Sequence, residues 1–311
     1  MRSPGAVLHN MLWRLASDRS DRRFLFVFGA PRSGTTLLQT CLAAHPQFFS
    51  VDGELTLFSF GQDIFRRDRF AGYLPDETLD EIYGRARTIA QFADLLYGAL
   101  TDGAEDCVCV EKLPPHRHMA RYVSRLFPQA RIVGIVRDGR DAYCSAQSHD
   151  HVRRTLGRNA ARFARAWSRR AELTLQLDGM PNATLIRYED FVRDPRSALA
   201  DVMSFADASF SESQLSPLAR QADRRAGQKA FAKLGGAIDT GSVSRWRREM
   251  DVESVRAFER AAGATLRHAG YPLSTDPGTP ERPRAGRQPI RSVPIALPGW
   301  HASGQVPPSG G

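Results

Sequence analysis

The stretch Phe24-Leu-Phe-Val-Phe-Gly-Ala-Pro-Arg-Ser-Gly-Thr-Thr-Leu-Leu38 decides the fold of this 311-residue chain. It contains an all-apolar strand, a loop bracketed by glycines and the start of a helix, an arrangement that cradles phosphate. Gly29 and Gly34 match the two glycines of a G-x-x-x-x-G-K-[ST] loop, and Thr36 matches its hydroxyl residue. Thr35, however, stands where that loop has its lysine. Because nucleotide triphosphatases need this lysine, the loop indicates a nucleotide site that does not transfer a γ-phosphate.

Strand and helix patterns alternate along the rest of the chain, which is typical of a parallel sheet covered on both faces. We therefore predict an α/β fold, with a P-loop-type parallel sheet, helices on both faces and a single domain. The motifs follow predicted strands, and open α/β sheets bind ligands at the carboxyl ends of their strands. The predicted strands are 24–28, 108–111, 131–136 and 183–187, and the predicted helices are 35–44, 115–127 and 138–148.

The composition predicts an N-terminal extension over residues 1–23, a domain over 24–273 and a disordered tail over 274–311. The tail is rich in Pro, Gly, Ser and Arg and shows no apolar period. The formal net charge of +9 favours anionic ligands, but we expect no nucleic acid partner because no recognised binding motif is present. No apolar run approaches the roughly eighteen residues of a membrane span, and we expect a cytoplasmic protein.

The histidines do not form a convincing metal site. His116 and His118 are two residues apart near a predicted helix start, where such side chains diverge. Zinc sites need further convergent ligands, and we therefore expect no metal. His149 and His151 follow the predicted helix 138–148, and contact with an acceptor or a role as secondary base stays open for them.

The loop Pro31–Leu38, followed by His45-Pro46, resembles the 5′-phosphosulfate loop of sulfotransferases that use 3′-phosphoadenosine 5′-phosphosulfate (PAPS). The segment Phe127–Ser145 resembles the strand-to-helix segment of the same family, in which an arginine and a serine eight positions later bind the 3′-phosphate. Two later blocks also resemble family blocks, namely Arg187–Val192 with Asp194-Pro195, and Arg245-Trp246 followed by Gly270-Tyr271. The resemblance extends over roughly residues 24–273, which is the whole of the predicted domain.

This resemblance implies a set of donor-binding residues and PAPS as the donor co-substrate. The family's 3′-phosphate residues correspond to Arg137 and Ser145, and Tyr188 corresponds to a position near the adenine. The segment 228–245 resembles the one that closes over the nucleotide, and only Arg245 within it matches a family motif. The implied donor-binding residues are Arg32, Ser33, Gly34, Thr35, Thr36, Arg137, Ser145, Tyr188 and Arg245.

Sulfuryl transfer needs a base for the acceptor hydroxyl and cations for the sulfonate and the departing phosphate. Glu54 resembles the glutamate base of tyrosylprotein sulfotransferases, with Asp52 open as the alternative and as a helix N-cap. Lys112 resembles the catalytic lysine of those enzymes in its sequence spacing from Arg137. The alternative interpretation is a surface lysine that pairs with Glu111 and has no catalytic role. Arg32 can form two parallel hydrogen bonds to a phosphate or sulfonate. The expected catalytic residues are Glu54, Lys112 and Arg32.

The sequence thus predicts a sulfotransferase that moves a sulfuryl group from PAPS to an acceptor hydroxyl by in-line displacement. The acceptor stays open among peptide tyrosine, a carbohydrate or glycolipid, and a small metabolite. A homodimer is also left open. The alternative functions are a P-loop kinase of a small molecule, which the missing loop lysine disfavours, and a non-catalytic nucleotide-binding protein.

Overall fold

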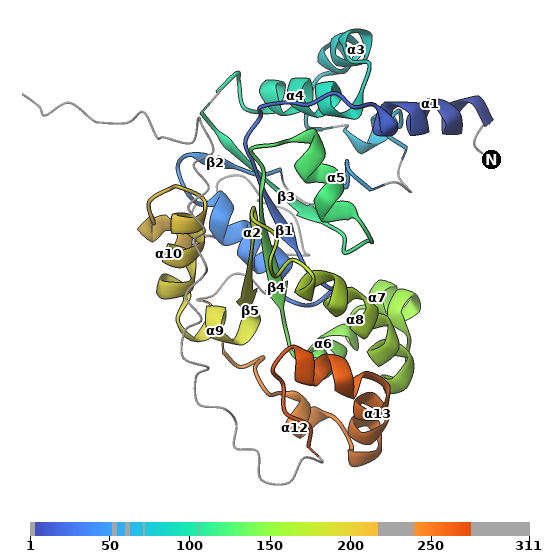
Figure 1. The fold of residues 1–311 in the computed structure, drawn as a ribbon, viewed down its shortest axis with the longest axis vertical. Helices are drawn as coiled ribbons and strands as arrows, with labels where there is room; N and C mark the ends of the chain where they lie inside the picture. The colour runs from blue at the N-terminus through green and yellow to red at the C-terminus, as the bar shows by residue number, and fades with distance from the viewer. Residues whose placement is uncertain are drawn as a thin grey trace, which may run out of the picture.

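The computed structural model describes residues 4–51, 55–59, 63–70, 72–104, 106–216, 238 and 240–274. Their strands form one parallel sheet in the order β2-β3-β1-β4-β5 (Figure 1). The apolar strand β1 lies at the centre between β3 and β4, and all five of its side chains are buried. The strands are β1 (Phe24–Phe28), β2 (Phe48–Phe49), β3 (Val108–Leu113), β4 (Arg131–Val136) and β5 (Ala183–Arg187).

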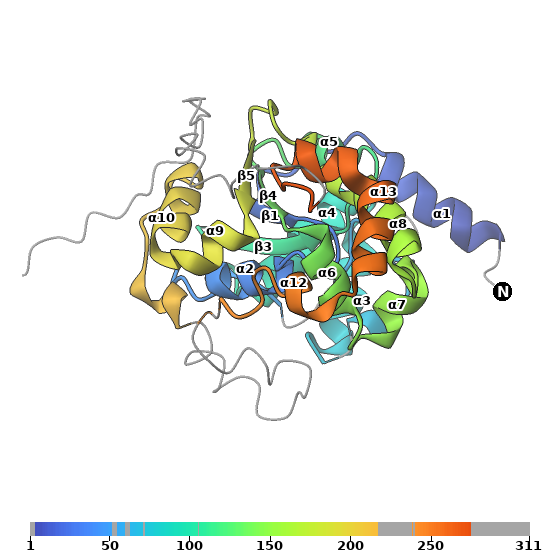
Figure 2. The same cartoon turned by 90° about the horizontal axis from the view of Figure 1, so that it is seen from below.

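Helices cover both faces of this sheet, which confirms the predicted fold class (Figures 1 and 2). Because side chains alternate along a strand, β1 sends Phe24, Phe26 and Phe28 to one face and Leu25 and Val27 to the other. Helices α4 and α5 pack against the first face, and α2, α9 and α10 pack against the second. The helices are α1 (Pro4–Leu15), α2 (Thr35–Ala43), α3 (Asp76–Arg85), α4 (Ile89–Leu100), α5 (Met119–Leu126), α6 (Gly139–Ala146), α7 (Asp150–Leu156), α8 (Ala160–Leu175), α9 (Tyr188–Arg193), α10 (Pro195–Phe205), α12 (Trp246–Glu249) and α13 (Val252–His268), with 3-10 helices η1 (Arg67–Arg69) and η2 (Glu212–Leu215).

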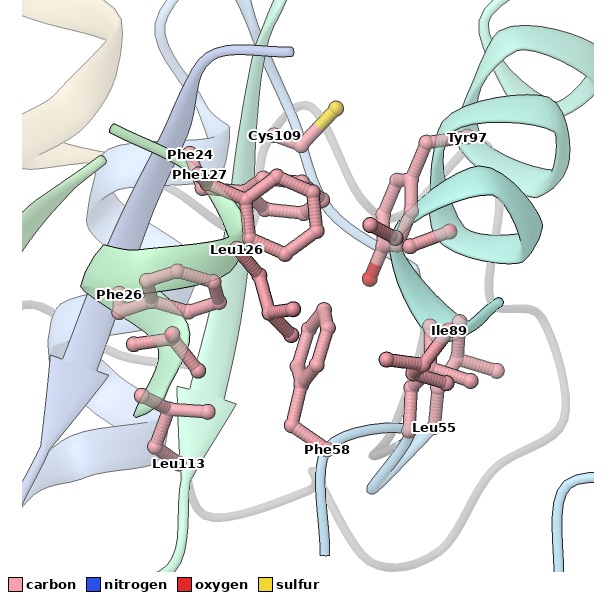
Figure 3. Close-up of a cluster of buried hydrophobic side chains, with 14 of the residues drawn as sticks. Phe24, Phe26, Leu55, Phe58, Ile89, Tyr97, Cys109, Leu113, Leu126 and Phe127 are labelled. Carbon is pink, nitrogen blue, oxygen red and sulfur yellow. The ribbon is translucent and has the colours of Figure 1, made fainter. Parts of the chain in front are cut away.

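An aromatic cluster fixes the first face of the sheet (Figure 3). The rings of Phe24 and Tyr97 pack edge to face with their centroids 5.0 Å apart, and those of Phe58 and Phe26 do the same at 5.4 Å. Phe127 packs against Phe24 at 4.6 Å. Edge-to-face pairs are more favourable than their buried area alone, so these contacts hold α4, α5 and the segment around Phe58 against the sheet.

The helix predicted at 115–127 begins later than its sequence pattern suggests. Pro114 and Pro115 lack backbone N–H groups, and His118 takes a left-handed conformation with φ of 64°. The chain therefore reaches a helical path only at Met119, where α5 begins. Strand β3 runs to Leu113, two residues beyond the predicted end at 111.

Helix α1 lies in the segment predicted as an N-terminal extension, and it packs on the domain. Trp13 joins the same hydrophobic cluster as the phenylalanines of β1. Arg14 is 1% exposed, and its Nη1 donates a hydrogen bond to the carbonyl of Leu57 at 2.9 Å. Tyr122 of α5 donates its hydroxyl to the carbonyl of Arg14 at 3.1 Å. Apart from its first residue, the tail predicted at 274–311 lies outside the described residues.

Candidate active site

The loop between β1 and α2 presents backbone N–H groups at the carboxyl edge of the sheet. Gly34 precedes the first residue of α2 with φ of 94°, and Arg32 also has a positive φ of 71°. Ser33 is buried between them, and its N–H bonds the carbonyl of Ala30 at 3.1 Å. Because a glycine has no side chain to cap the helix, the first N–H groups of α2 are available to an anion.

Gly34 is also required because the ring of Tyr188 packs against it. A Cβ atom at this position would lie 2.4 Å from Cδ2 of Tyr188. We expect Gly34→Ala to lower the free energy of unfolding by about 1–3 kcal/mol more than Gly103→Ala, because overpacking costs that much. Gly103 is the matched control, since it also has a positive φ but a Cβ there meets nothing within 4 Å. Urea denaturation of both variants measures the difference, and equal losses would contradict the contact.

Lys112 lies on the loop side of β3, beside the start of α2. In the parallel register it is opposite Val27 of β1, and its Nζ donates a hydrogen bond to Oγ1 of Thr36 at 3.0 Å. Neighbouring residues of a strand point to opposite faces, so Glu111 faces the aromatic cluster and accepts a hydrogen bond from the hydroxyl of Tyr97 at 2.5 Å. The ammonium group of Lys112 therefore lies next to the hydroxyl of Thr36, and the equivalent hydroxyl binds magnesium in nucleotide triphosphatases.

Three predicted donor-site residues from distant parts of the sequence meet at the ends of β1 and β4. Arg32 donates from Nε to Oγ of Ser145 in α6 at 3.1 Å. Arg137, which directly follows β4, donates from Nη1 to the carbonyl of Arg32 at 3.0 Å. The pKa of Arg32 is lowered by burial, and further by the nearby charges of Arg137 and Arg245. The two neighbouring cations that lower the pKa of Arg32 also favour a bound anion at this place.

Tyr188 and Ser242 complete the surroundings of Arg137. The guanidinium of Arg137 lies over the ring of Tyr188, 4.3 Å from its centroid. Its Nη2 donates to the carbonyl of Ser242 at 2.8 Å, and the hydroxyl groups of Tyr188 and Ser242 are 2.7 Å apart. The Nε of Arg137 is buried and has no hydrogen-bond partner in the described part of the chain. A guanidinium with a spare buried N–H fits an anionic oxygen.

A buried charged network supports this site, and the sequence analysis did not identify it. Asp141 accepts hydrogen bonds from the backbone N–H groups of Ser244 at 2.7 Å and Trp246 at 2.9 Å. Arg140 bonds Asp138 at 2.7 Å, Glu259 at 2.6 Å and the carbonyl of Pro272 at 3.0 Å. Burial raises the pKa of Asp141.

The signal for this network was the run Arg137-Asp-Gly-Arg-Asp141 directly after an apolar strand. Charged residues at that position must be paired if they are buried. The pairing positions the segment Thr240–Trp246 over Arg137, since Asp141 holds its backbone.

Of the remaining candidate residues, the structure describes Arg245 and His149 but neither of the two candidate bases. Arg245 forms an ion pair with Glu249 at 2.7 Å, and this hydrogen bond raises the pKa of the arginine. His149 lies near the site, with its Nδ1 3.1 Å from the carbonyl of Ser145. Glu54 and Asp52 lie outside the described residues, as does most of the segment 228–245.

The described residues contain neither a cluster of metal ligands nor a membrane-spanning helix. No group of three or more His, Cys, Asp or Glu side chains within them could hold a metal ion. Among the same residues, no helix combines the length and the apolar character needed to cross a membrane.

Two curated proteins are similar to this chain in sequence. The nodulation protein NoeE of Sinorhizobium fredii (strain NBRC 101917 / NGR234) is 26% identical over 86% of this chain and 71% of its own length. Protein-tyrosine sulfotransferase 2 of Gallus gallus is 27% identical over 61% of this chain and 53% of its own length. The chain thus spans about half of the tyrosine sulfotransferase that it matches.

Solved structures share the fold. The sulfotransferase domain of the Synechococcus PCC 7002 olefin synthase superposes with a TM-score of 0.61 at 24% identity, covering 84% of this chain and 99% of that one. Mouse sulfotransferase SULT7A1, solved in complex with PAP, gives a TM-score of 0.51 at 15% identity over 85% of this chain and 91% of that one. The model of the Sulfotransferase family matches residues 25–212. The chain therefore belongs to the sulfotransferase family.

Proposed function

We propose that the chain transfers a sulfuryl group from PAPS to an acceptor hydroxyl, and that it acts in the cytoplasm, where this donor would be made. The observation that carries the proposal is the meeting of Arg32, Arg137 and Ser145 at one edge of the sheet. PAPS carries a 3′-phosphate and a 5′-phosphosulfate, so the protein needs two separate groups of hydrogen-bond donors to bind them. Arg137 and Ser145 would bind the first, and the loop Arg32–Thr36 with the N-terminus of α2 would bind the second.

The environment of Thr36 favours a metal-free donor. In nucleotide triphosphatases the equivalent hydroxyl binds magnesium. In this chain the ammonium group of Lys112 is hydrogen-bonded to that hydroxyl at 3.0 Å. A protein cation beside Thr36 supports a phosphosulfate rather than a magnesium-bound triphosphate, and the complex of SULT7A1 with PAP supports the same class of nucleotide. This arrangement does not support the alternative function, a P-loop kinase.

The reaction that we propose divides the chemistry among three residues. The acceptor oxygen attacks the sulfur atom, and the bond from sulfur to the 5′-phosphate oxygen breaks with its electron pair leaving on the phosphate. Glu54 would take the acceptor proton, with Asp52 as its alternative. Lys112 would neutralise the leaving phosphate, and Arg32 would stabilise the sulfonate oxygens during transfer.

A direct screen of acceptor molecules can identify which class of hydroxyl receives the sulfuryl group. The curated relatives include a protein-tyrosine sulfotransferase and a nodulation protein. We propose a hydroxyl-bearing acceptor, and a screen with sulfur-labelled PAPS should compare a tyrosine peptide, a carbohydrate or glycolipid, and phenolic metabolites. Labelled product identifies the class directly, and the enzyme without acceptor is the blank.

Nucleotide binding tests the donor assignment. We expect 3′,5′-bisphosphoadenosine without magnesium to raise the melting temperature, whereas ATP with magnesium should not. Calorimetry should show that Arg137→Ala weakens bisphosphoadenosine about tenfold to a hundredfold, because each charge-assisted hydrogen bond contributes about 1.5–3 kcal/mol. Adenosine 5′-phosphate is the control ligand, and its affinity should stay the same in the variant. Equal affinity of the wild type for both nucleotides would refute the 3′-phosphate site.

A further inference from the structure

Helix α6 carries two residues that serve the same candidate phosphate site. Ser145 is in its last turn and accepts the hydrogen bond from Arg32. Asp141 is in its first turn, is only 1% exposed, and accepts hydrogen bonds from the backbone of Ser244 and Trp246. Residues four apart on a helix lie on the same face. One face of α6 therefore holds both the predicted 3′-phosphate serine and a segment from much later in the sequence.

This later segment, Ser242–Trp246, which we call the cover segment, is held in a conformation that its sequence does not favour. Ser244 has φ of 57°, and a residue other than glycine stays in this left-handed region only where its surroundings hold it. The carboxylate of Asp141 does so by accepting the N–H of Ser244 at 2.7 Å and that of Trp246 at 2.9 Å. The guanidinium of Arg140 adds a contact, 3.9 Å from the centroid of the Trp246 ring. Helix α12, which begins at Trp246, accordingly lies beside α6 (Figures 1 and 2).

The cover segment places a main-chain carbonyl on Arg137. Nη2 of Arg137 donates to the carbonyl of Ser242 at 2.8 Å, while Nη1 donates to the carbonyl of Arg32 at 3.0 Å. Two carbonyls from separate segments fix the plane of the guanidinium. Its buried Nε has no partner among the described residues and is available to an anion. Because the contact from Ser242 is a backbone carbonyl, its position depends on how the cover segment is held and not on the side chain at 242.

We propose that Asp141 is a positioning residue for the 3′-phosphate of the donor, and that it acts through the cover segment on Arg137. This inference rests on the proposed function, and it makes Asp141 a determinant of specificity for nucleotides that carry a 3′-phosphate. An ionised carboxylate suits the task because both of its oxygens accept hydrogen bonds and neither donates. An amide at this position would direct its NH₂ group at one of the two backbone N–H groups.

Calorimetry of the full chain with two nucleotides tests the proposal. We expect Asp141→Asn to bind 3′,5′-bisphosphoadenosine about tenfold more weakly, because Arg137 loses part of its orientation. Adenosine 5′-phosphate has no 3′-phosphate, and its affinity should stay within about twofold of the wild type. A merely structural role of Asp141 would weaken both nucleotides alike. Asp251→Asn is the matched control, since that carboxylate also accepts a backbone N–H, from Ser254 at 2.7 Å, but caps α13. It should bind both nucleotides as the wild type does.

A double-mutant cycle shows whether Asp141 acts through Arg137. In an Arg137→Ala background, Asp141→Asn should lower the affinity for bisphosphoadenosine by no more than about twofold, since the group that it positions is gone. Additive losses would overturn the proposal. If the wild type prefers bisphosphoadenosine and Asp141→Asn prefers it equally, the inference is refuted while the proposed function stands. A wild type without this preference would refute both.

Hydrogen exchange of the wild type gives a measurement that does not depend on the folding of a variant. Coupling between two sites is reciprocal, so a 3′-phosphate that binds better when the cover segment is held must in turn stabilise that segment. Saturating bisphosphoadenosine should therefore slow exchange of the Ser244 and Trp246 amides about tenfold more than saturating adenosine 5′-phosphate does. Equal slowing by the two nucleotides would show that the 3′-phosphate and the hold of Asp141 are independent, and would overturn the proposal.

Discussion

Replacing Lys112 with alanine should slow single-turnover sulfuryl transfer by about 10²–10³-fold, the usual cost of removing one group that stabilises developing charge. The affinity for 3′,5′-bisphosphoadenosine should change little. The lysine would act when the phosphate leaves, whereas Arg32, Arg137 and the amides of the loop would hold the nucleotide throughout. Because Nζ of Lys112 is anchored at Oγ1 of Thr36, the charge is already positioned before the donor arrives.

The Lys112→Arg variant is the matched control, since it keeps the charge but places it on a larger, planar group. We expect it to recover part of the rate. Rapid-quench measurements with labelled donor, beside calorimetry with bisphosphoadenosine, separate the two roles. Unchanged transfer in Lys112→Ala would remove the residue from the mechanism, and equal losses of rate and affinity would make it a binding residue only.

Glu54→Gln should retain donor binding and lose transfer by roughly a hundredfold or more, the typical contribution of a general base. The amide keeps the size of the side chain but cannot take the acceptor proton. Asp52→Asn is the matched variant, because the two carboxylates are the alternative bases and both lie outside the described residues. Steady-state rates with an acceptor from the screen give the answer. A slow Asp52→Asn beside an active Glu54→Gln would assign the base to Asp52.

The central strand and the placement of the motifs could be predicted from sequence because both depend on local patterns. Five consecutive apolar residues from Phe24 to Phe28, followed by a glycine-bracketed loop, are typical of a strand buried on both faces, and that strand is at the centre of the sheet. Parallel strands end at one edge, so Lys112 and Arg137 were expected near the loop. These expectations needed only the direction of each strand, which the alternation of strands and helices supplies.

The side-chain contacts could not be predicted in this way because they depend on residues far apart. The bond from Arg32 to Ser145 joins positions 113 residues apart, and no local pattern encodes it. The packing of α1 was hidden for a related reason. Arg14 interrupts the apolar run in the sequence, but its guanidinium is buried because the carbonyl of Leu57 accepts from it.

The buried charged network around Arg140 and Asp141 affects the order in which parts of the protein can form during synthesis. Both residues lie in the middle of the sequence, yet their partners at Ser244, Glu259 and Pro272 come near the end of the described residues. A ribosome therefore releases Arg137 into solution about a hundred residues before the groups that cover it exist. Until then Asp141 must stay hydrated and Arg140 can pair only with Asp138, since a buried charge without its partner is costly. The nascent protein can complete its sheet once β5 has been made, but the segment that covers Arg137 follows only after α10.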